Sequence, residues 1–182
     1  MSLPAEAGTR RRLFFALWPD EAVREQLHQA SRVLTRDKRG KVVSQANLHI
    51  TLAFLGSVET GTAQCLIQQA DALVLPGFSL TLDRAGYWTG PRVLWLGCEQ
   101  TPVPLQALVG SLQQLQRLCG LEPESRPFHT HLTVMRKLAP HGVTFPAFEP
   151  VAWPVASFAL VASDTRPEGA VYSVVKSWPL QG

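Results

Sequence analysis

The 182-residue sequence has few cysteines and no long hydrophobic run. Cys65, Cys98 and Cys119 are odd in number, widely spaced and without a C-x-x-C pair, so we predict buried thiols rather than a disulfide framework or a thiolate zinc site. No apolar segment approaches the roughly 20 residues that span a bilayer, and residues 1–12 lack the hydrophobic core of a signal peptide. These absences predict a cytoplasmic protein that does not bind a membrane.

Short motifs of several large enzyme classes are also missing. The sequence contains no P-loop, no G-x-G-x-x-G fingerprint and no H-E-x-x-H pair, which argues against nucleotide-driven ligation and against zinc-peptidase chemistry. Charged residues make up only 17% of the chain, and the net charge is +3. An excess this small permits an anionic partner without establishing one.

Hydrophobic patterning predicts one domain over residues 11–182, after a flexible tail of residues 1–10. Helices and strands interleave, but short turns between strands are frequent, so we expect a mixed α+β fold with mainly antiparallel sheets. The Pro-rich interval 140–154 suits an ordered connection rather than a helix or a central strand. The expected strands are 11–18, 47–56, 78–88, 93–98, 128–136, 157–163 and 171–176, and the expected helices are 20–34, 62–75 and 104–120.

One short pattern occurs twice, 82 positions apart: His49-Ile-Thr51 and His131-Leu-Thr133. Residues i and i+2 of a strand share a face, so each histidine shares a face with its threonine while the residue between them turns to the core. A single copy is most simply a strand histidine satisfied by hydrogen bonding. Two copies, one in each half of the chain, indicate a catalytic site.

Two imidazoles and two hydroxyls are the groups that phosphodiester cleavage needs. A base removes a proton from the attacking oxygen, and an acid protonates the departing oxygen. An imidazole pKa near 6.5 allows one histidine to be neutral and the other protonated at working pH. Thr51 and Thr133 would donate hydrogen bonds to the non-bridging phosphate oxygens. This chemistry needs no metal or other cofactor.

These residues resemble the 2H phosphoesterase superfamily, in particular the bacterial RNA 2′,3′-cyclic phosphodiesterase branch, also called the 2′-5′ RNA ligase family. Beside the two H-x-T motifs, the resemblance includes Arg12–Pro19, Asn47–Gly56, Arg126–Phe128, Arg136 and Tyr172–Leu180, and it covers nearly the whole chain.

The resemblance implies a bilobal α+β fold, in which two mainly antiparallel sheets are related by a pseudo-twofold axis around a central cleft. It implies hydrolysis of an RNA 2′,3′-cyclic phosphate end to a 2′-phosphomonoester, with 2′-5′ ligation as the minor reverse reaction in water. By motif position, His49 would be the proton donor and His131 the proton acceptor. The substrate would be an RNA end, such as that of a tRNA half, or a small cyclic nucleotide, bound by a monomer.

One departure from the family pattern lies before the second motif, where proline is common and this sequence has Thr130. His129 then shares strand parity with His131, so it either binds substrate at the cleft edge or is solvated near the strand start. Arg126 and Arg136 would neutralise phosphate or the RNA backbone, or are ordinary surface charges. Any of the five tryptophans would stack on a base if it reached the cleft.

Two other functions compete with this hypothesis. In a metal hydrolase, His49, His129 and His131 would form a three-histidine site, although no further ligand pattern supports it. In a non-catalytic RNA- or nucleotide-binding module of the same fold, both histidines and both threonines would be unnecessary.

Overall fold

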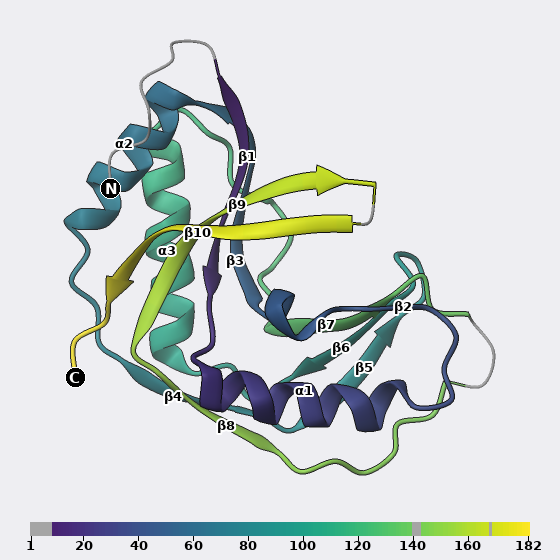
Figure 1. Ribbon diagram of the computed structural model, residues 1–182. Coiled ribbons are helices and arrows are strands. Elements are labelled where there is room, and N and C mark those ends of the chain that lie inside the picture. The colour runs from purple at the N-terminus through teal and green to yellow at the C-terminus, as the bar shows by residue number, and fades with distance from the viewer. Residues whose placement is uncertain (1–8, 140–142, 168) are drawn as a thin grey trace.

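The computed structural model describes residues 9–139, 143–167 and 169–182 (Figure 1). The predicted tail, residues 1–10, therefore lies almost wholly outside the described residues. The elements in chain order are β1 (Arg10–Leu17), α1 (Glu21–Thr35), β2 (Lys41–Val42), the 3-10 helix η1 (Gln45–Asn47), β3 (Ile50–Glu59), α2 (Thr60–Asp71), β4 (Phe78–Leu82), β5 (Arg84–Trp88), β6 (Val93–Gly97), α3 (Val103–Leu118), β7 (His131–Arg136), β8 (Val151–Val155), β9 (Ser157–Arg166) and β10 (Gly169–Pro179).

The main sheet runs in the order β10-β9-β1-β3-β7-β6-β5, and β2 pairs with the outer part of β7. All strand pairings of this sheet are antiparallel, which agrees with the prediction of mainly antiparallel sheets. The strands β3 and β7 meet at Ile50 and Leu132, whereas β1 pairs with β3 along its whole length. This short junction divides the sheet into two halves, which diverge from it in Figure 1.

Helices cover each half of the sheet on one face. The helices α2 and α3 lie beside each other against the half that contains β1 and β3, and α1 lies against β7 and the small β4–β8 sheet (Figure 1). Ile50 and Leu132, which lie between the histidine and the threonine of each motif, are buried as predicted. Leu52 and Val134, directly after the threonines, are buried as well. The fold is α+β and bilobal.

The first helix shows how the local sequence sets an element. Asp20 caps α1, because its carboxylate accepts a hydrogen bond of 2.8 Å from the backbone N–H of Val23. The apolar positions Val23, Leu27 and Leu34 are buried, as the helical spacing predicts. Since α1 follows β1 after only three residues, it fixes the direction in which the chain leaves the end of β1 beside the site.

Two expected elements differ in extent from the structure. The expected strand 78–88 is divided at Asp83 into β4 and β5, which belong to different sheets. The Pro-rich interval contains a strand after all, β8, which pairs with β4 and includes Pro154. β8 is not a central strand, as predicted, because the β4–β8 sheet has only two strands and both are therefore edge strands. Proline is tolerated in an edge strand.

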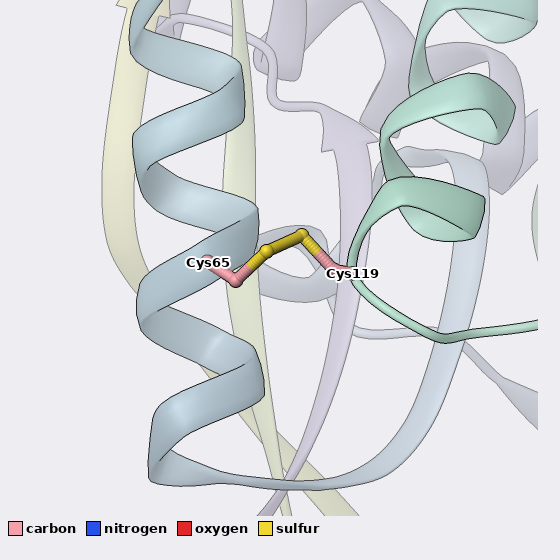
Figure 2. The surroundings of a disulfide bond; sticks show 2 residues. All are labelled: Cys65 and Cys119. Carbon is pink, nitrogen blue, oxygen red and sulfur yellow. A yellow bond between two sulfur atoms is a disulfide. The ribbon is translucent and has the colours of Figure 1, made fainter.

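The prediction of three buried thiols was wrong. Cys65 of α2 and Cys119, which directly follows α3, form a disulfide with a Cα–Cα distance of 5.8 Å (Figure 2). Cys98 is a free thiol. The two cysteines are 54 positions apart and come together only because α2 and α3 lie side by side. An odd number of cysteines does not exclude a disulfide, because two of the three can pair while the third stays a free thiol.

No helix among the described residues is both long enough and apolar enough to cross a membrane. The cytoplasmic location remains a prediction. A stable disulfide is more typical of oxidising compartments, so the Cys65–Cys119 bond does not favour that location.

Candidate active site

The junction between β3 and β7 brings the two H-x-T motifs together. Ile50 lies directly across from Leu132, and both side chains are fully buried. Because neighbouring side chains on a strand point to opposite faces, the residues on either side of this pair face the other way. Because the two strands are antiparallel, His49 lies across from Thr133, and Thr51 lies across from His131. We call these four residues the motif quartet: His49, Thr51, His131 and Thr133.

Both histidines are oriented by a backbone carbonyl two residues earlier in the chain. His49 Nδ1 donates to the Asn47 carbonyl at 2.6 Å, and His131 Nδ1 donates to the His129 carbonyl at 2.8 Å. A carbonyl only accepts, so each neutral ring carries its proton on Nδ1 and offers a lone pair at Nε2. The Thr51 hydroxyl lies 3.1 Å from His49 Nε2. The two rings therefore present the same reactive nitrogen in the same protonation state.

Aromatic rings surround His49. Trp18 stacks on the imidazole at a centroid distance of 5.6 Å, while Phe14 lies at 5.0 Å and Tyr172 contacts it edge-on at 5.1 Å. Burial lowers the pKa of His49 to about 4, although its hydrogen bond to the Asn47 carbonyl acts in the opposite direction. His49 is therefore neutral at pH 7 in the ligand-free protein.

His131 has a more open environment. Trp88 lies edge-on to its imidazole at a centroid distance of 4.6 Å. Burial lowers the pKa of His131, and the neighbouring charges of His129 and Arg136 lower it further, against the opposing hydrogen bond to the His129 carbonyl. The two motifs match in backbone geometry, and their surroundings distinguish the two imidazoles.

A buried arginine supports the His49 side of the site. Arg24 of α1 is 8% exposed, and its guanidinium donates to the carbonyls of Pro19, Gln45 and Ala46 at 2.9, 3.0 and 3.1 Å. The same guanidinium lies 5.3 Å from the ring of Trp18, in a cation–π arrangement. Arg24 thus ties together the chain after β1, which carries the stacking tryptophan, and η1, which ends at Asn47.

Asn47 joins His49 to the β9–β10 hairpin. Its carbonyl accepts the His49 Nδ1 hydrogen bond, and its side-chain amide donates to the Ala170 carbonyl of β10 at 3.0 Å. Tyr172, two residues further along β10, contacts the His49 ring. One residue therefore fixes both the imidazole and the strand that covers it.

Two glycines make room for an aromatic cluster on the His131 side. A Cβ atom on Gly86 would lie 2.1 Å from the Trp95 ring, and one on Gly97 would lie 2.8 Å from it. Trp95 can therefore lie flat across these backbones, where it contacts His129 at a centroid distance of 5.0 Å and Trp88 at 5.3 Å. Only glycine at position 86 permits this close approach.

Thr130 has a structural role. Its side chain is buried on the face opposite His131, and its hydroxyl lies 2.9 Å from the Thr101 hydroxyl just before α3. His129 is exposed and packs against Trp88 and Trp95. The carbonyl of His129 therefore orients His131, and its ring lies next to the site. Whether this ring binds substrate stays a prediction.

The two arginines considered for phosphate binding occupy different places. Arg136 ends β7, three residues after Thr133, and its charge lowers the pKa of both His49 and His131. Arg126 forms an exposed two-point ion pair with Glu124 at 2.9 and 3.1 Å, and it lines a cavity of about 630 Å³ beside α3. Among the described residues, no hydrogen bond or ion pair connects Arg126 to the motif quartet.

Within the described part of the chain, no three histidine, cysteine, aspartate or glutamate side chains gather in a way that could hold a metal ion. The proposed set of His49, His129 and His131 therefore does not form a ligand cluster here.

Residues 17–95 match the family model described as LigT-like phosphoesterase. The RNA 2′,3′-cyclic phosphodiesterase of Escherichia coli K12 is 37% identical over 93% of this chain and 97% of its own length. The protein of the same name from Thermus thermophilus is 32% identical over 94% and 91%. The chain belongs to the LigT-like phosphoesterase family.

Solved structures agree with this family membership. The crystal structure of E. coli LigT in its apo form aligns with a TM-score of 0.86 at 36% identity, over 96% of this chain and all of that one. A structure of E. coli LigT with 3′-AMP aligns with the same TM-score over 95% of this chain and 99% of that one. The predicted superfamily and the predicted bilobal fold are both confirmed.

Sequence reasoning identified the motif quartet of this LigT-like protein but not its surroundings. Arg24 carries no motif, and Arg32, the other arginine of α1, is exposed. The position of Arg24 directly after Val23 and three residues before Leu27, two apolar positions of the helix, was the one available signal. The partners of Trp18 and Tyr172 depend on how β1, β3, β9 and β10 pair, which spacing within one strand does not reveal.

Proposed function

We propose that this LigT-like chain hydrolyses the 2′,3′-cyclic phosphate at an RNA end to a 2′-phosphomonoester. The observation that carries the proposal is the register at Ile50 and Leu132, which puts two imidazoles with available Nε2 atoms on one face. Diagonal cross-strand neighbours are roughly 7 to 8 Å apart, a separation that accommodates a phosphate group between two side chains. Curated relatives over nearly the full length carry the name of this activity.

In the proposed reaction, a water oxygen attacks phosphorus and the bond from phosphorus to the 3′ oxygen breaks. His131 Nε2 accepts the proton of the water, and His49 Nε2 delivers a proton to the departing 3′ oxygen. Thr51 and Thr133 donate hydrogen bonds to the non-bridging oxygens, and Arg136 offsets the phosphate charge. The reverse sequence with a 5′-hydroxyl in place of water would form a 2′-5′ linkage.

His49 must be protonated to act as the proton donor, but burial disfavours its protonated form. With a pKa of about 4, the ligand-free ring is neutral at pH 7. An anionic phosphate beside the ring favours the imidazolium and raises this pKa when substrate binds. The stacked Trp18 also stabilises a positive ring through its π face. Substrate binding and protonation of His49 are therefore coupled.

The proposal is tested with an oligonucleotide that ends in a 2′,3′-cyclic phosphate, in excess chelator. His49→Asn and His131→Asn each keep a donor that reaches the i−2 carbonyl, so the fold is retained, but they remove Nε2. Each should lower kcat by about 100-fold or more, while His28→Ala, on the outer part of α1, should leave it unchanged. Normal turnover by the His131→Asn variant would contradict the two-histidine mechanism, and tight binding without turnover by the unaltered protein would indicate a binding module.

A further inference from the structure

Strand β3 is irregular directly after the first motif. Thr51 and Ala53 lie across from consecutive residues of β1, so the register leaves Leu52 between them as an extra residue, a β-bulge. A bulge bends a strand and changes which of its side chains share a face. Beyond the junction with β7, β3 pairs with β1 alone among the described residues, so no second strand supports this bulge.

The bulge brings Phe54 to the face of the motif quartet. In a regular strand, residues three apart point to opposite faces, which would separate Phe54 from Thr51. Here the Phe54 ring lies 6.5 Å from the Phe14 ring, and the Phe14 ring lies 5.0 Å from the His49 imidazole. The Thr51 hydroxyl contacts the same imidazole at 3.1 Å. The bulge therefore sets both the place of Thr51 and part of the ring packing beside His49.

A buried glutamine of α3 holds the strand just beyond the bulge. Gln116 is 1% exposed, and its side-chain amide donates a hydrogen bond of 3.0 Å to the Phe54 carbonyl. A buried amide is costly unless it is hydrogen-bonded, so this bond ties the glutamine and the strand to each other. Because α3 packs in the core together with Ile50 and Leu52, Gln116 reaches β3 from the side opposite the motif quartet.

The disulfide closes a ring of contacts around Gln116. Cys119 directly follows α3, and its backbone N–H donates to the Gln116 carbonyl at 3.1 Å. Cys65 lies in α2, which begins at Thr60 immediately after β3 ends. The disulfide thus joins the helix that continues β3 to the end of the helix that carries Gln116 (Figure 2).

We infer that Gln116 is a positioning residue: its bond to the Phe54 carbonyl holds the bulge of β3, and the disulfide holds Gln116. The inference rests on the proposed function and deepens it, because it adds to the motif quartet a residue that acts from behind the strand. Thr51 must reach a phosphate oxygen in the transition state, and a displacement of about 1 Å can lower a rate by about 100-fold. Loss of the Gln116 bond should therefore lower the rate more than the affinity.

The first test replaces Gln116 with methionine, which has a similar length but no hydrogen-bond donor. At a temperature well below its melting transition, Gln116→Met should lower kcat for an RNA with a 2′,3′-cyclic phosphate end by about fivefold or more, with KM changed by less than about twofold. Gln116→Asn keeps the amide but is one methylene shorter, and should behave in the same way. The matched control is Gln114→Met, at an exposed position of the same helix, which should change neither constant. Normal kcat in Gln116→Met, or an equal loss in Gln114→Met, would overturn the inference.

The second test removes the disulfide. Cys65→Ser/Cys119→Ser should also lower kcat at temperatures where the variant is fully folded. When it is combined with Gln116→Met, it should cause no further loss, because both changes act on the same contact and their effects are then not additive. Additive losses, or an unchanged kcat in the cysteine variant, would overturn the link between the disulfide and Gln116.

Histidine titration by NMR provides a readout that needs no turnover. Because Phe14 and Phe54 pack beside His49, Gln116→Met should reduce the burial of that imidazole and raise its pKa toward 6.5, while the pKa of His131 stays unchanged. If the unaltered protein does not hydrolyse the RNA but the pKa of His49 responds to Gln116→Met, the proposed function is wrong and the positioning role is supported. A lower melting temperature with normal kcat and an unchanged pKa of His49 would show that Gln116 only stabilises the fold.

Discussion

Ile50 and Leu132 lie directly across from each other at the junction of β3 and β7, and this pair sets the geometry of the site. Both side chains point into the core, so the four motif side chains on either side of the pair must share the opposite face. A shift of one residue in this register would bury the histidines and expose the two aliphatic side chains. The hydrophobic core therefore enforces the catalytic arrangement.

The pH dependence of kcat/KM should have its maximum below pH 6.5. The active free enzyme needs one imidazole neutral and the other protonated, and the population of that form is greatest between the two pKa values. Burial lowers the pKa of both His49 and His131 from 6.5, so this maximum shifts to the acid side. The bound phosphate anion raises the pKa of a nearby imidazole, so the maximum of kcat should lie at higher pH than that of kcat/KM.

Stopped-flow or steady-state rates from pH 4 to 9 measure both profiles when chemistry limits turnover. A kcat/KM maximum above pH 7.5 would mean that burial does not govern these imidazoles in the working enzyme.

Arg24→Gln should lower kcat with little change in KM, because Arg24 contacts no substrate and acts by positioning. The substitution leaves the buried carbonyl of Pro19 without its Arg24 donor and removes hydrogen bonds to the Gln45 and Ala46 carbonyls, at a cost of about 1 to 3 kcal/mol in the free energy of unfolding. It also loosens Trp18 and the segment that carries the Asn47 carbonyl, so the pKa of His49 should change.

Urea denaturation measures the first effect, and histidine titration by NMR measures the second. Arg32→Gln, at an exposed position of the same helix, is the matched control. If the Arg24→Gln variant loses stability while the pKa of His49 is unchanged, Arg24 stabilises the fold but does not position His49.

Gly86→Ala should impair the site without a change in any polar group. The added methyl group would lie 2.1 Å from the Trp95 ring and must displace it, together with its contacts to Trp88 and His129. Overpacking of this kind destabilises proteins by about 1 to 3 kcal/mol. Gly90→Ala, in the turn of the same hairpin, meets no atom within 4 Å and should be neutral.

Melting temperature, kcat and the tryptophan fluorescence spectrum together test this prediction. An unaltered spectrum and normal kcat in the Gly86→Ala variant would contradict the close packing of Trp95.

The Cys65–Cys119 disulfide should stabilise the fold. It closes a segment of 54 positions, and chain-entropy arguments assign such a crosslink about 4 kcal/mol, with typical measured values of about 2 to 4 kcal/mol. The Cys65→Ser/Cys119→Ser variant should unfold at lower urea concentration than the oxidised protein. The reduced protein should behave as the variant does, whereas reductant should not affect the variant.

Thiol titration under denaturing conditions provides the direct measurement. The oxidised chain should show one thiol, from Cys98, and the reduced chain three. Three thiols in the protein as purified without reductant would show that the bond does not form.

Several features were predictable from sequence because they depend on neighbours along one strand or helix. Strand parity predicted that His49 and Thr51 share a face while Ile50 is buried, and helical spacing predicted the buried stripe of α1. Both patterns arise from backbone geometry and need no knowledge of what lies across from them.

Other features depend on the docking of elements far apart in the chain. The Cys65–Cys119 bond requires α2 and α3 to lie side by side, and the ring of Tyr172 meets His49 only because β10 folds over η1. The surroundings of the two motifs have the same origin. Burial lowers the pKa of both imidazoles, but Trp18, Phe14 and Tyr172 surround His49, whereas Trp88 lies against His131.

The most direct measurement of the central claim is the identity of the product. A ³¹P NMR spectrum of an RNA with a 2′,3′-cyclic phosphate end, incubated with the protein and excess chelator, should show conversion to a 2′-phosphomonoester that stops when both histidines are replaced by asparagine. A 3′-phosphomonoester, or hydrolysis that chelator abolishes, would contradict the account.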